Sequence, residues 1–323
     1  MGLLGGRKTR YACHNPGRSR VMCSVNSAEG ATVLPEPAAT QVFENHRELL
    51  MAVAYRVLGR VCDAEDVVQE AWLRWSGVRH SDVHNPRAYL VRVTTRLAID
   101  RLRRVQARRE EYIGPWLPEP MLTTGDAADD AALADSVSLA MLVVLETLSP
   151  LERAVFVLRE AFSYSYPDIA EIIGRSEAAV RQLASRAREH VAGKRPRFDA
   201  DRVTRRRVTE QFLAACTNGN MQALLELLAP DVSLVGDGGG RAKAPLRVIN
   251  GADKVARFLI AIATDPAAAD LQVDLIEVNG GPALVAFAAG VPVTVLALDL
   301  ADGLVQTVRL VANPDKLAGL SHR

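Results

Sequence analysis

Four polar side chains at helical spacing have the chemistry needed to read DNA bases: Arg181, Gln182, Ser185 and Arg186. Arginine can bridge the O6 and N7 atoms of guanine, glutamine can pair with adenine, and serine suits a phosphate contact. A solvated basic helix in an ordinary bundle carries the same residue types. The elements that hold these side chains therefore decide between the two interpretations.

Start and stop signals divide the surrounding segment into short helices. Ser165, with Asp168 three residues later, predicts a short helix over Asp168–Ile173, which Gly174 ends in the left-handed conformation. Ser176 predicts the cap of a further helix that runs to about His190. A short helix, a glycine-centred turn and a capped second helix form the helix-turn-helix that binds the DNA major groove. The predicted DNA-contacting residues are Ser176, Arg181, Gln182, Ser185 and Arg186.

The apolar pattern agrees with this assignment. Val180, Leu183 and Ala187 recur at helical spacing and should pack inward, leaving the polar side chains outside. Upstream, Ser149 and Glu152 form a capping box with a proline at the first helical position, which predicts the start of another helix. DNA binding by this segment is the favoured interpretation.

The charge is distributed unevenly along the 323 residues, whose formal net charge is only +1. Residues 86–110 carry 8 Lys and Arg against 2 acidic residues, and residues 175–209 carry 11 against 4. Residues 111–174 between them carry 2 against 11. Two basic segments separated by acidic sequence are typical of a protein that binds nucleic acid.

Neither a metal site nor a membrane span is predicted. Cys13, Cys23, Cys62 and Cys216 have no zinc-ligand spacing and indicate unpaired thiols, so we expect no metal and no cofactor. Residues 280–298 contain no charged residue, but prolines and glycines interrupt the run. It predicts a pair of strands, because a spanning helix needs about 20 uninterrupted apolar residues.

Helical patterns also fill the N-terminal part. Residues 1–40 lack periodicity, and we expect them to be disordered. A helix is predicted from Gln41 to near Gly59, a second is expected to be capped by Asp63 and to reach Trp75, and a third should start at Asn85-Pro86.

These blocks resemble the two conserved regions of bacterial extracytoplasmic-function sigma factors over about Phe43–Arg188. The resemblance rests on DAEDVVQEAWLRW and NPRAYLVRVTTRLAIDRLRR, then an acidic linker, then LSPLERAVFVLRE and IAEIIGRSEAAVRQLASRAR. It implies a non-enzymatic protein that binds core RNA polymerase and promoter DNA. The residues it places on the polymerase-binding helix are Asp66, Gln69, Glu70 and Arg74. Those it places on or beside the helix that reads the −10 element are Arg92, Arg96, Asp100, Arg101 and Arg103. It also implies that the helix-turn-helix reads the −35 element, through Ser176, Arg181, Gln182, Ser185 and Arg186.

The linker and the C-terminal part extend the resemblance. WLPEP, residues 116–120, is similar to the hallmark of a sigma-factor subgroup with a fused C-terminal domain. Its Trp and Leu form a stiff apolar segment that should be buried against that domain. The predicted docking residues are Trp116, Leu117 and Pro118 of the linker, Asp237 in DGGG, and Asn313, Asp315 and Lys316 in NPDKL.

The C-terminal part itself is predicted to be an α+β cone. Helices are expected over Val208–Thr217, Met221–Leu228 and Gly251–Ala263, with a short strand over Val232–Val235. Four strand-like runs follow as a meander: Leu271–Val278, Ala283–Ala288, Val293–Leu300 and Leu304–Leu310. The order resembles SnoaL-like domains of the nuclear-transport-factor fold. Asp237, Asp274 and Asp299 could serve such a fold as a catalytic base, but none has a neighbouring histidine, and a regulatory or ligand-sensing role is favoured.

The predicted organisation is multidomain: two all-α sigma domains, the second a helix-turn-helix, followed by the cone. Its boundaries are a tail (1–40), region 2 (41–104), a linker (105–138), region 4 (139–192), a basic hinge (193–207) and the SnoaL-like domain (208–323). We expect the protein to act in the cytoplasm, to bind no membrane and to require no separate anti-sigma protein. An unidentified small ligand could bind the C-terminal domain. Two alternatives stay open: a one-component helix-turn-helix regulator, and a SnoaL-type isomerase or hydrolase tethered to DNA.

Overall fold

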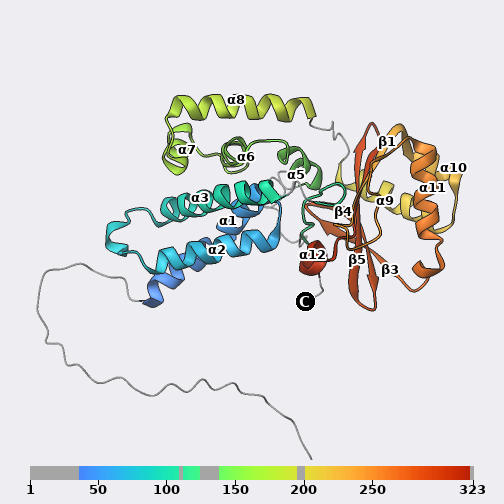
Figure 1. Ribbon diagram of the computed structural model, residues 1–323, viewed down its shortest axis with the longest axis horizontal. Coiled ribbons are helices and arrows are strands. Elements are labelled where there is room, and N and C mark those ends of the chain that lie inside the picture. Colours follow the sequence, from blue (N-terminus) through green and yellow to red (C-terminus); the bar gives the residue numbers. More distant parts are fainter. Residues whose placement is uncertain (1–35, 109–111, 124–137, 195–200, 321–323) are drawn as a thin grey trace, which may run out of the picture.

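The computed structural model describes residues 36–108, 112–123, 138–194 and 201–320, which form three parts (Figure 1). The N-terminal helical domain contains α1 (Glu36–Leu58), α2 (Val61–Ser76), η1 (His80–Asp82) and α3 (Pro86–Arg108). The helix-turn-helix domain contains α5 (Leu139–Leu145), α6 (Pro150–Phe156), the π-helical turn η4 (Val157–Ala161), α7 (Tyr166–Ile173) and α8 (Glu177–Lys194). The C-terminal domain follows from residue 201.

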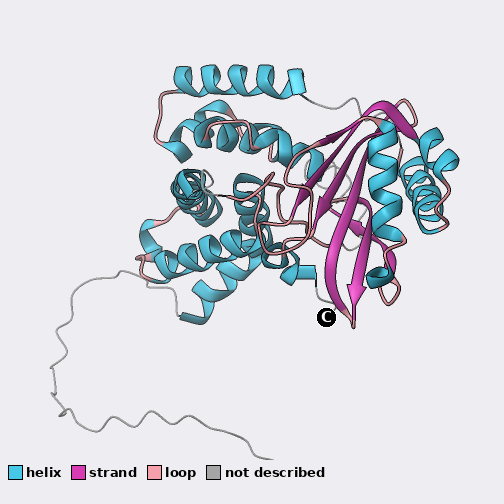
Figure 2. Cartoon of the chain, turned by 45° about the vertical axis from the view of Figure 1, so that its right-hand side comes forward, coloured by secondary structure: helices cyan, strands magenta, loops and turns pink. Residues whose placement is uncertain are grey.

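The two helical domains share one hydrophobic core. A single cluster of buried side chains runs from Phe43 on α1 through Leu90 on α3 to Val155 on α6 and Val180 on α8. α3 lies against α7, and both views place the helix-turn-helix domain directly over α3 (Figures 1 and 2). The domains that were predicted as separate DNA-binding units are therefore packed together in this structure.

Helix α1 begins before the predicted end of the tail. The helix starts at Glu36, and the buried Trp75 donates its indole N–H to the backbone oxygen of Ala39 at 2.9 Å. This contact fixes the first turns of α1 on α2, which corrects the expectation that residues up to 40 are unstructured. The rest of the expected tail, residues 1–35, lies outside the described residues.

Helix α2 also begins differently from the prediction. Asp63 does not cap it; the carboxylate is buried and accepts two hydrogen bonds from Arg101, at 2.6 and 2.9 Å. The helix starts at Val61, whose N–H is bonded to the Glu119 Oε2 atom of the linker at 3.1 Å. At the other end of the domain, α3 continues to Arg108, past the expected boundary at residue 104.

The helix signals of the helix-turn-helix domain are confirmed. Both capping boxes form, Ser149 with Glu152 and Ser165 with Asp168. Gly174 ends α7 with φ 66°, in the left-handed region where a side chain would be strained. Two bounds are corrected: α7 starts at Tyr166 rather than at residue 168, and α8 reaches residue 194 rather than about 190.

The C-terminal domain is a curved sheet with a helical layer on one face (Figure 2). The sheet has the order β2-β1-β6-β5-β4-β3, in which β3 to β6 form the predicted antiparallel meander and β1 runs parallel to β6. Its strands are β1 (Leu228–Asp237), β2 (Ile249–Asn250), β3 (Gln272–Val278), β4 (Gly281–Ala288), β5 (Val291–Ala301) and β6 (Leu304–Val311). Its helices are α9 (Arg202–Thr217), α10 (Met221–Leu227), α11 (Ala252–Ala263), η5 (Pro266–Ala268), α12 (Pro314–Leu317) and η6 (Ala318–Leu320).

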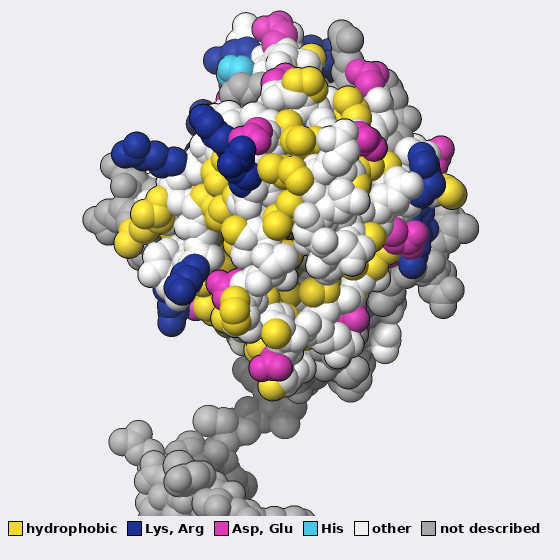
Figure 3. All heavy atoms as spheres, turned by 90° about the vertical axis from the view of Figure 1, so that its right-hand side faces the viewer, with side chains coloured by type: hydrophobic (Ala, Val, Ile, Leu, Met, Phe, Trp, Pro, Cys, Tyr) yellow, Lys and Arg dark blue, Asp and Glu magenta, His cyan; other side chains and the backbone are white. Residues whose placement is uncertain are grey.

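Each face of the sheet has its own core. Side chains such as Leu296 and Val308 pack with α9, α10 and α11, whereas Val285 and Phe287 on the other face pack with the linker and α12. On the side turned away from the helical domains, apolar side chains lie among polar ones and charged groups lie mostly towards the margins (Figure 3).

Two predicted bounds in this part are corrected. Asp201 caps α9 with its side chain, so the second half of the expected hinge, from Arg202, is helical, and residues 195–200 lie outside the described residues. Strand β1 is longer than the expected Val232–Val235, because its parallel pairing with β6 continues to Asp237. That extension carries Asp237 to the end of the sheet, where the linker lies.

Candidate functional site

The predicted −35 readers share one open face of α8. Arg181, Gln182, Ser185 and Arg186 are exposed, and Val180 and Ala187 on the opposite face are buried. Ser176 is also exposed, and its hydroxyl accepts a hydrogen bond from the Ala179 N–H at 3.3 Å. Within the described residues the guanidinium of Arg181 pairs with Glu177 one turn away, which is an exposed contact that a DNA base can replace. The predicted DNA-reading face of α8 is accessible.

Two of the predicted −10 residues, Arg92 and Arg96, contact the helix-turn-helix domain. Arg96 on α3 donates to the backbone oxygen of Ile172 at 2.7 Å and to that of Glu171 at 3.1 Å. Arg92, one turn earlier, forms an ion pair with the Glu171 side chain at 3.0 Å. These carbonyls belong to the last turn of α7 and have no acceptor role within the helix. A guanidinium there provides them with hydrogen bonds and is attracted to the negative end of the helix dipole. The two arginines are therefore occupied by protein.

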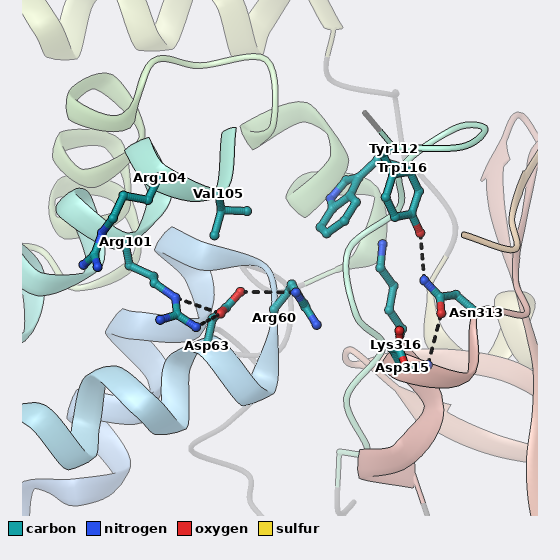
Figure 4. A pocket seen from close by; sticks show the side chains of 10 residues that line it. All are labelled: Arg60, Asp63, Arg101, Arg104, Val105, Tyr112, Trp116, Asn313, Asp315 and Lys316. Carbon is teal, nitrogen blue, oxygen red and sulfur yellow. Dashed lines mark hydrogen bonds and ion pairs between the residues drawn. The ribbon is translucent and has the colours of Figure 1, made fainter. Parts of the chain in front are cut away.

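The remaining predicted −10 residues make contacts within their own domain. Asp100 and Arg103 form an exposed ion pair at 3.0 Å. Arg101 binds the buried Asp63 (Figure 4) and reaches Asp66 at 3.0 Å, and the hydrogen bond that its guanidinium donates to Asp63 raises the pKa of that guanidinium. The structure thus brings one predicted −10 residue, Arg101, into contact with one predicted polymerase-binding residue, Asp66.

The predicted polymerase-binding face is open. Asp66, Gln69, Glu70 and Arg74 are exposed on α2, and Arg74 pairs with Glu70 at 3.1 Å along the helix. Beside them a groove of about 520 Å³ runs between α1 and α2, with Phe43, Val68, Gln69 and Trp72 in its lining. An open groove with an aromatic floor and a charged rim suits docking of another protein.

A buried cluster, here named the linker clamp, joins the linker to the C-terminal domain. It consists of Tyr112, Leu117, Asp237, Asn313 and Lys316. The Asp237 carboxylate is fully buried and accepts hydrogen bonds from the Leu117 N–H at 2.8 Å, the Lys316 ammonium at 2.6 Å and the Tyr112 hydroxyl. Asn313 donates to the same hydroxyl at 2.8 Å. Every member has a polar partner, which offsets the cost of burying the charges.

Aromatic and apolar contacts complete the clamp. The Lys316 Nζ lies 3.3 Å from the centre of the Trp116 ring, a close cation–π contact. Leu117 is 1 % exposed and packs in the cluster that contains Val278 and Phe287 of the sheet. Pro118 is buried too. Asp315 is different, since its carboxylate binds Arg241 within the C-terminal domain, at 2.5 and 2.7 Å.

The glycines of DGGG allow this close approach. A Cβ atom on Gly239 would lie 2.3 Å from the Asn313 Nδ2 and 2.9 Å from the Tyr112 hydroxyl. A Cβ on Gly240 would lie 2.8 Å from the Ile113 side chain. Both glycines have positive φ. The motif thus serves as a tight backbone turn and also as a surface against which the linker lies.

The sequence interpretation missed a second junction, centred on Tyr55, Glu119 and Asn279. The Tyr55 hydroxyl donates to the backbone oxygen of Glu119 and accepts from the Asn279 amide, each at 2.7 Å. Asn279 also exchanges hydrogen bonds with Met121, at 2.9 and 3.0 Å. The available signal was the sequence Asn279-Gly280-Gly281, which is typical of a hairpin turn but does not indicate which residues Asn279 binds. Burial raises the pKa of the Glu119 carboxyl to about 7.

The three aspartates considered as a catalytic base are engaged in structural contacts. Asp237 belongs to the linker clamp, and Asp274 accepts from the neighbouring Gln272 amide at 3.1 Å. Asp299 is buried and paired with Arg309; burial raises the pKa of its carboxyl, and Arg309 opposes that shift. Among the described residues, no group of His, Cys, Asp or Glu side chains is arranged to hold a metal, and no helix is long and apolar enough to cross a membrane.

Comparison with known proteins gives two family matches and similar full-length relatives. The family model for sigma-70 region 2 matches residues 42–109, and that for sigma-70 region 4 matches residues 138–191. The ECF RNA polymerase sigma factor SigJ of Mycobacterium tuberculosis is 39% identical over 290 residues, which are 86% of this chain and 92% of SigJ. The probable ECF sigma factor SigI of the same species is 35% identical over 275 residues, 84% of this chain and 92% of SigI. The crystal structure of SigJ aligns with a TM-score of 0.70 at 38% identity, covering 87% of this chain and 98% of that one.

Proposed function

Because the chain belongs to the extracytoplasmic-function RNA polymerase sigma factors, we propose that its C-terminal domain restrains the two DNA-binding domains in cis. The chain is a sigma factor that binds core RNA polymerase and directs promoter-specific initiation, and it carries a fused SnoaL-like domain. The N-terminal helical domain is region 2 and the helix-turn-helix domain is region 4. In this proposal the C-terminal domain keeps region 4 packed against the −10 face of region 2.

The observation that carries the proposal is the contact between α3 and α7. We assign Arg96 to the −10 contact, and in this structure its guanidinium donates hydrogen bonds to the backbone oxygens of Ile172 and Glu171. It cannot bind DNA and these carbonyls at once, so region 4 must move away before α3 reads the −10 element. The open face of α8 supports a −35 contact from Arg181, Gln182 and Arg186 that does not need this movement.

The linker clamp supplies the restraint in this proposal. The linker connects the two sigma regions to each other. The clamp attaches this linker to the sheet through the Lys316–Asp237 pair and the buried side chain of Leu117. Burial of the Leu117 side chain contributes about 1.5 to 3 kcal/mol, and the half-buried Trp116 ring adds to it, before the linker's lost entropy is subtracted. A contact of this strength favours the arrangement in which region 4 packs on region 2. Binding of core polymerase to the open α1–α2 groove can overcome this preference.

The same contacts support a regulatory rather than a catalytic C-terminal domain. Asp237 and Asp299 are neutralised by Lys316 and Arg309, so neither is placed to remove a proton from a substrate. A restraint built into the chain removes the need for a separate anti-sigma protein. The proposed site of action is the cytoplasm, where core polymerase and promoter DNA are found.

The test weakens the clamp without touching a proposed polymerase or DNA contact. Leu117→Ser removes a buried side chain at a cost of about 2 to 5 kcal/mol. Run-off transcription with a limiting amount of core enzyme should then rise relative to the unchanged chain. Val291→Ser is the matched control, since Val291 is 60% exposed on the C-terminal domain. An output from Leu117→Ser that equals or falls below that of the control would refute the restraint.

A further inference from the structure

Three arginine side chains converge on Tyr166, the first residue of α7. The Cζ atoms of Arg181 and Arg159 lie 4.6 and 4.8 Å from the centre of the tyrosine ring. Arg188 donates a hydrogen bond to the tyrosine hydroxyl at 3.0 Å. Arg181 and Arg188 come from α8 and Arg159 from η4, so the ring lies where three elements of the helix-turn-helix domain meet. The proposed function uses Arg181 and gives the tyrosine no role.

The position of the Tyr166 ring is well defined. Ser165 and Asp168 form the capping box that starts α7, which fixes the backbone on both sides of the tyrosine. The tyrosine side chain is half-buried. Arg159, which lies over the ring, is held in turn by a hydrogen bond from its Nη1 atom to the Tyr164 backbone oxygen at 2.9 Å. The ring is therefore a firm support for a side chain of α8 that contacts it.

Arg181 contacts this ring without using its hydrogen-bond donors. Its Cζ atom lies over Tyr166 while its Nε atom donates to the exposed Glu177 carboxylate at 3.0 Å. Arg181 lies near the N-terminal end of α8, which is the part of a recognition helix that contacts base edges. When a guanine replaces Glu177, the same donors can bind its O6 and N7 atoms, and the ring contact can persist.

Arg186, the other arginine predicted to read a base, has no such support. Its Nε atom lies 4.0 Å from the Glu152 Oε1 atom, and no aromatic ring of the described residues lies beneath its guanidinium. An arginine that is free in solvent gives up rotamer freedom when it binds, whereas one that is already held loses less. The two predicted base readers should therefore differ in how much they depend on the surrounding protein.

We propose that Tyr166 is a positioning residue for promoter recognition, which holds the Arg181 guanidinium ready to read its base. The tyrosine acts through Arg181 and needs no DNA contact of its own. Without the ring, Arg181 keeps its donors but samples more rotamers, so the preference for the base pair that it reads should fall. Loss of an exposed cation–π contact corresponds to a change of about two- to fivefold in affinity. This role rests on the proposed −35 contact of Arg181 and is independent of the proposed restraint.

Selection from DNA duplexes randomised over one helical turn tests this role with the full-length chain. Sequencing of the bound duplexes gives the base preference at each position. Arg181→Ala and Arg186→Ala first identify the base pair that each arginine reads. Tyr166→Leu should then lower the preference about two- to fivefold at the Arg181 base pair and leave the preference at the Arg186 base pair unchanged. Tyr166→Phe, which keeps the ring, should retain both preferences.

Tyr164→Leu is the matched control for this experiment. Tyr164 is another half-buried tyrosine of the same segment, and its side chain lies beside Arg87 of α3. The change should leave both base preferences as they are in the unchanged chain. Melting curves establish that each variant is folded. If Tyr166→Leu fails to fold, Tyr166→Met takes its place, because methionine is unbranched and fills irregular gaps.

Three outcomes would overturn the positioning role. These are unchanged preferences in Tyr166→Leu, a loss of equal size at both base pairs, and a loss in Tyr166→Phe that matches the loss in Tyr166→Leu. The second would indicate a general structural role, and the third would assign the effect to the hydroxyl and its contact with Arg188. If Arg181→Ala itself alters no base preference, the proposed −35 contact fails and the positioning role fails with it. A loss in Arg181→Ala without one in Tyr166→Leu rejects the positioning role and leaves that contact intact.

Discussion

Lys316 and Asp237 form a buried ion pair with Nζ and Oδ2 2.6 Å apart, and the side chains are 1% and 0% exposed. The pair connects α12 to the end of β1 and holds the backbone of Leu117 between them. An ion pair so completely buried is sensitive to the loss of either partner.

Lys316→Met should therefore release the linker. Removing one partner of a buried pair costs about 3 to 5 kcal/mol, because the other charge is left uncompensated. We expect faster protease cleavage within the linker and a lower melting temperature. Arg241→Gln is the control, because its exposed pair with Asp315 is worth about 0.2 to 1 kcal/mol. Equal protease resistance in both variants would contradict the importance of the pair.

Attachment of the linker should weaken as the pH rises. Burial raises the pKa of the Glu119 carboxyl from 4.5 to about 7, so the folded chain binds more protons than the unfolded chain between these values. The free energy of unfolding then falls by about 3 kcal/mol as the pH increases through this window. Melting curves from about pH 5 to about pH 8 measure this slope.

Glu119→Gln separates this effect from the other titrating groups. The amide oxygen can still accept the hydrogen bond from the Val61 N–H, but the side chain no longer titrates. Asp299, whose pKa burial also raises, contributes equally to both proteins. The slope should be smaller in Glu119→Gln, and identical slopes would show that Glu119 is not its source.

Opening of the two sigma regions should follow Arg96→Ala. The change removes two hydrogen bonds from a charged donor, which contribute about 1.5 to 3 kcal/mol each at most. A fluorescence donor on α2 and an acceptor on α8 should report a larger population with a long separation. Arg257→Ala should leave the distribution unchanged, and a compact Arg96→Ala chain would argue against the α3–α7 contact as the closing element.

Reversal of the charges of Asp66 and Glu70 to Lys should abolish binding to core polymerase. Both side chains are exposed on α2, and surface changes usually alter stability by about 0.5 kcal/mol or less. A pull-down with core enzyme, together with a melting curve to establish folding, measures the effect. Unchanged affinity would remove α2 from the polymerase interface.

Promoter preference should depend on Arg181 and Arg186. Alanine at either position should cost on the order of 1 to 3 kcal/mol on a matched −35 element and much less on a mismatched one. Competition binding with the two DNA sequences gives the ratio. A similar loss on both sequences would indicate phosphate contacts rather than base contacts.

The sequence predicts local structure well where the signal lies within a few residues. The capping boxes at Ser149 and Ser165 and the left-handed Gly174 are examples, because each needs neighbouring residues only. The apolar pair Trp116 and Leu117 also indicated that the linker would be buried. The partners of the linker were partly predictable, since the DGGG and NPDKL turns were the polar-rimmed segments available to it.

Long-range hydrogen bonds to the backbone could not be predicted in the same way. Arg96 binds the carbonyl oxygens of α7, and any residue at positions 171 and 172 would offer those acceptors. Asp63 has the type and position of a helix cap, but Arg101 from α3 binds it, and Glu119 receives the first N–H of α2 instead. Such pairings depend on the assembled fold and leave no periodic pattern.

The linker clamp also sets an order of events during synthesis. Regions 2 and 4 and the linker are complete before Asp237, Asn279 and Lys316, which bind the linker in this structure, have been translated. At about 5 to 20 residues per second, roughly 10 to 40 s separate translation of the linker from that of residue 316. During this interval a nascent chain carries regions 2 and 4 without the partners of its linker. Under the restraint proposed above, each newly made molecule passes once through an unrestrained state before the C-terminal domain is complete.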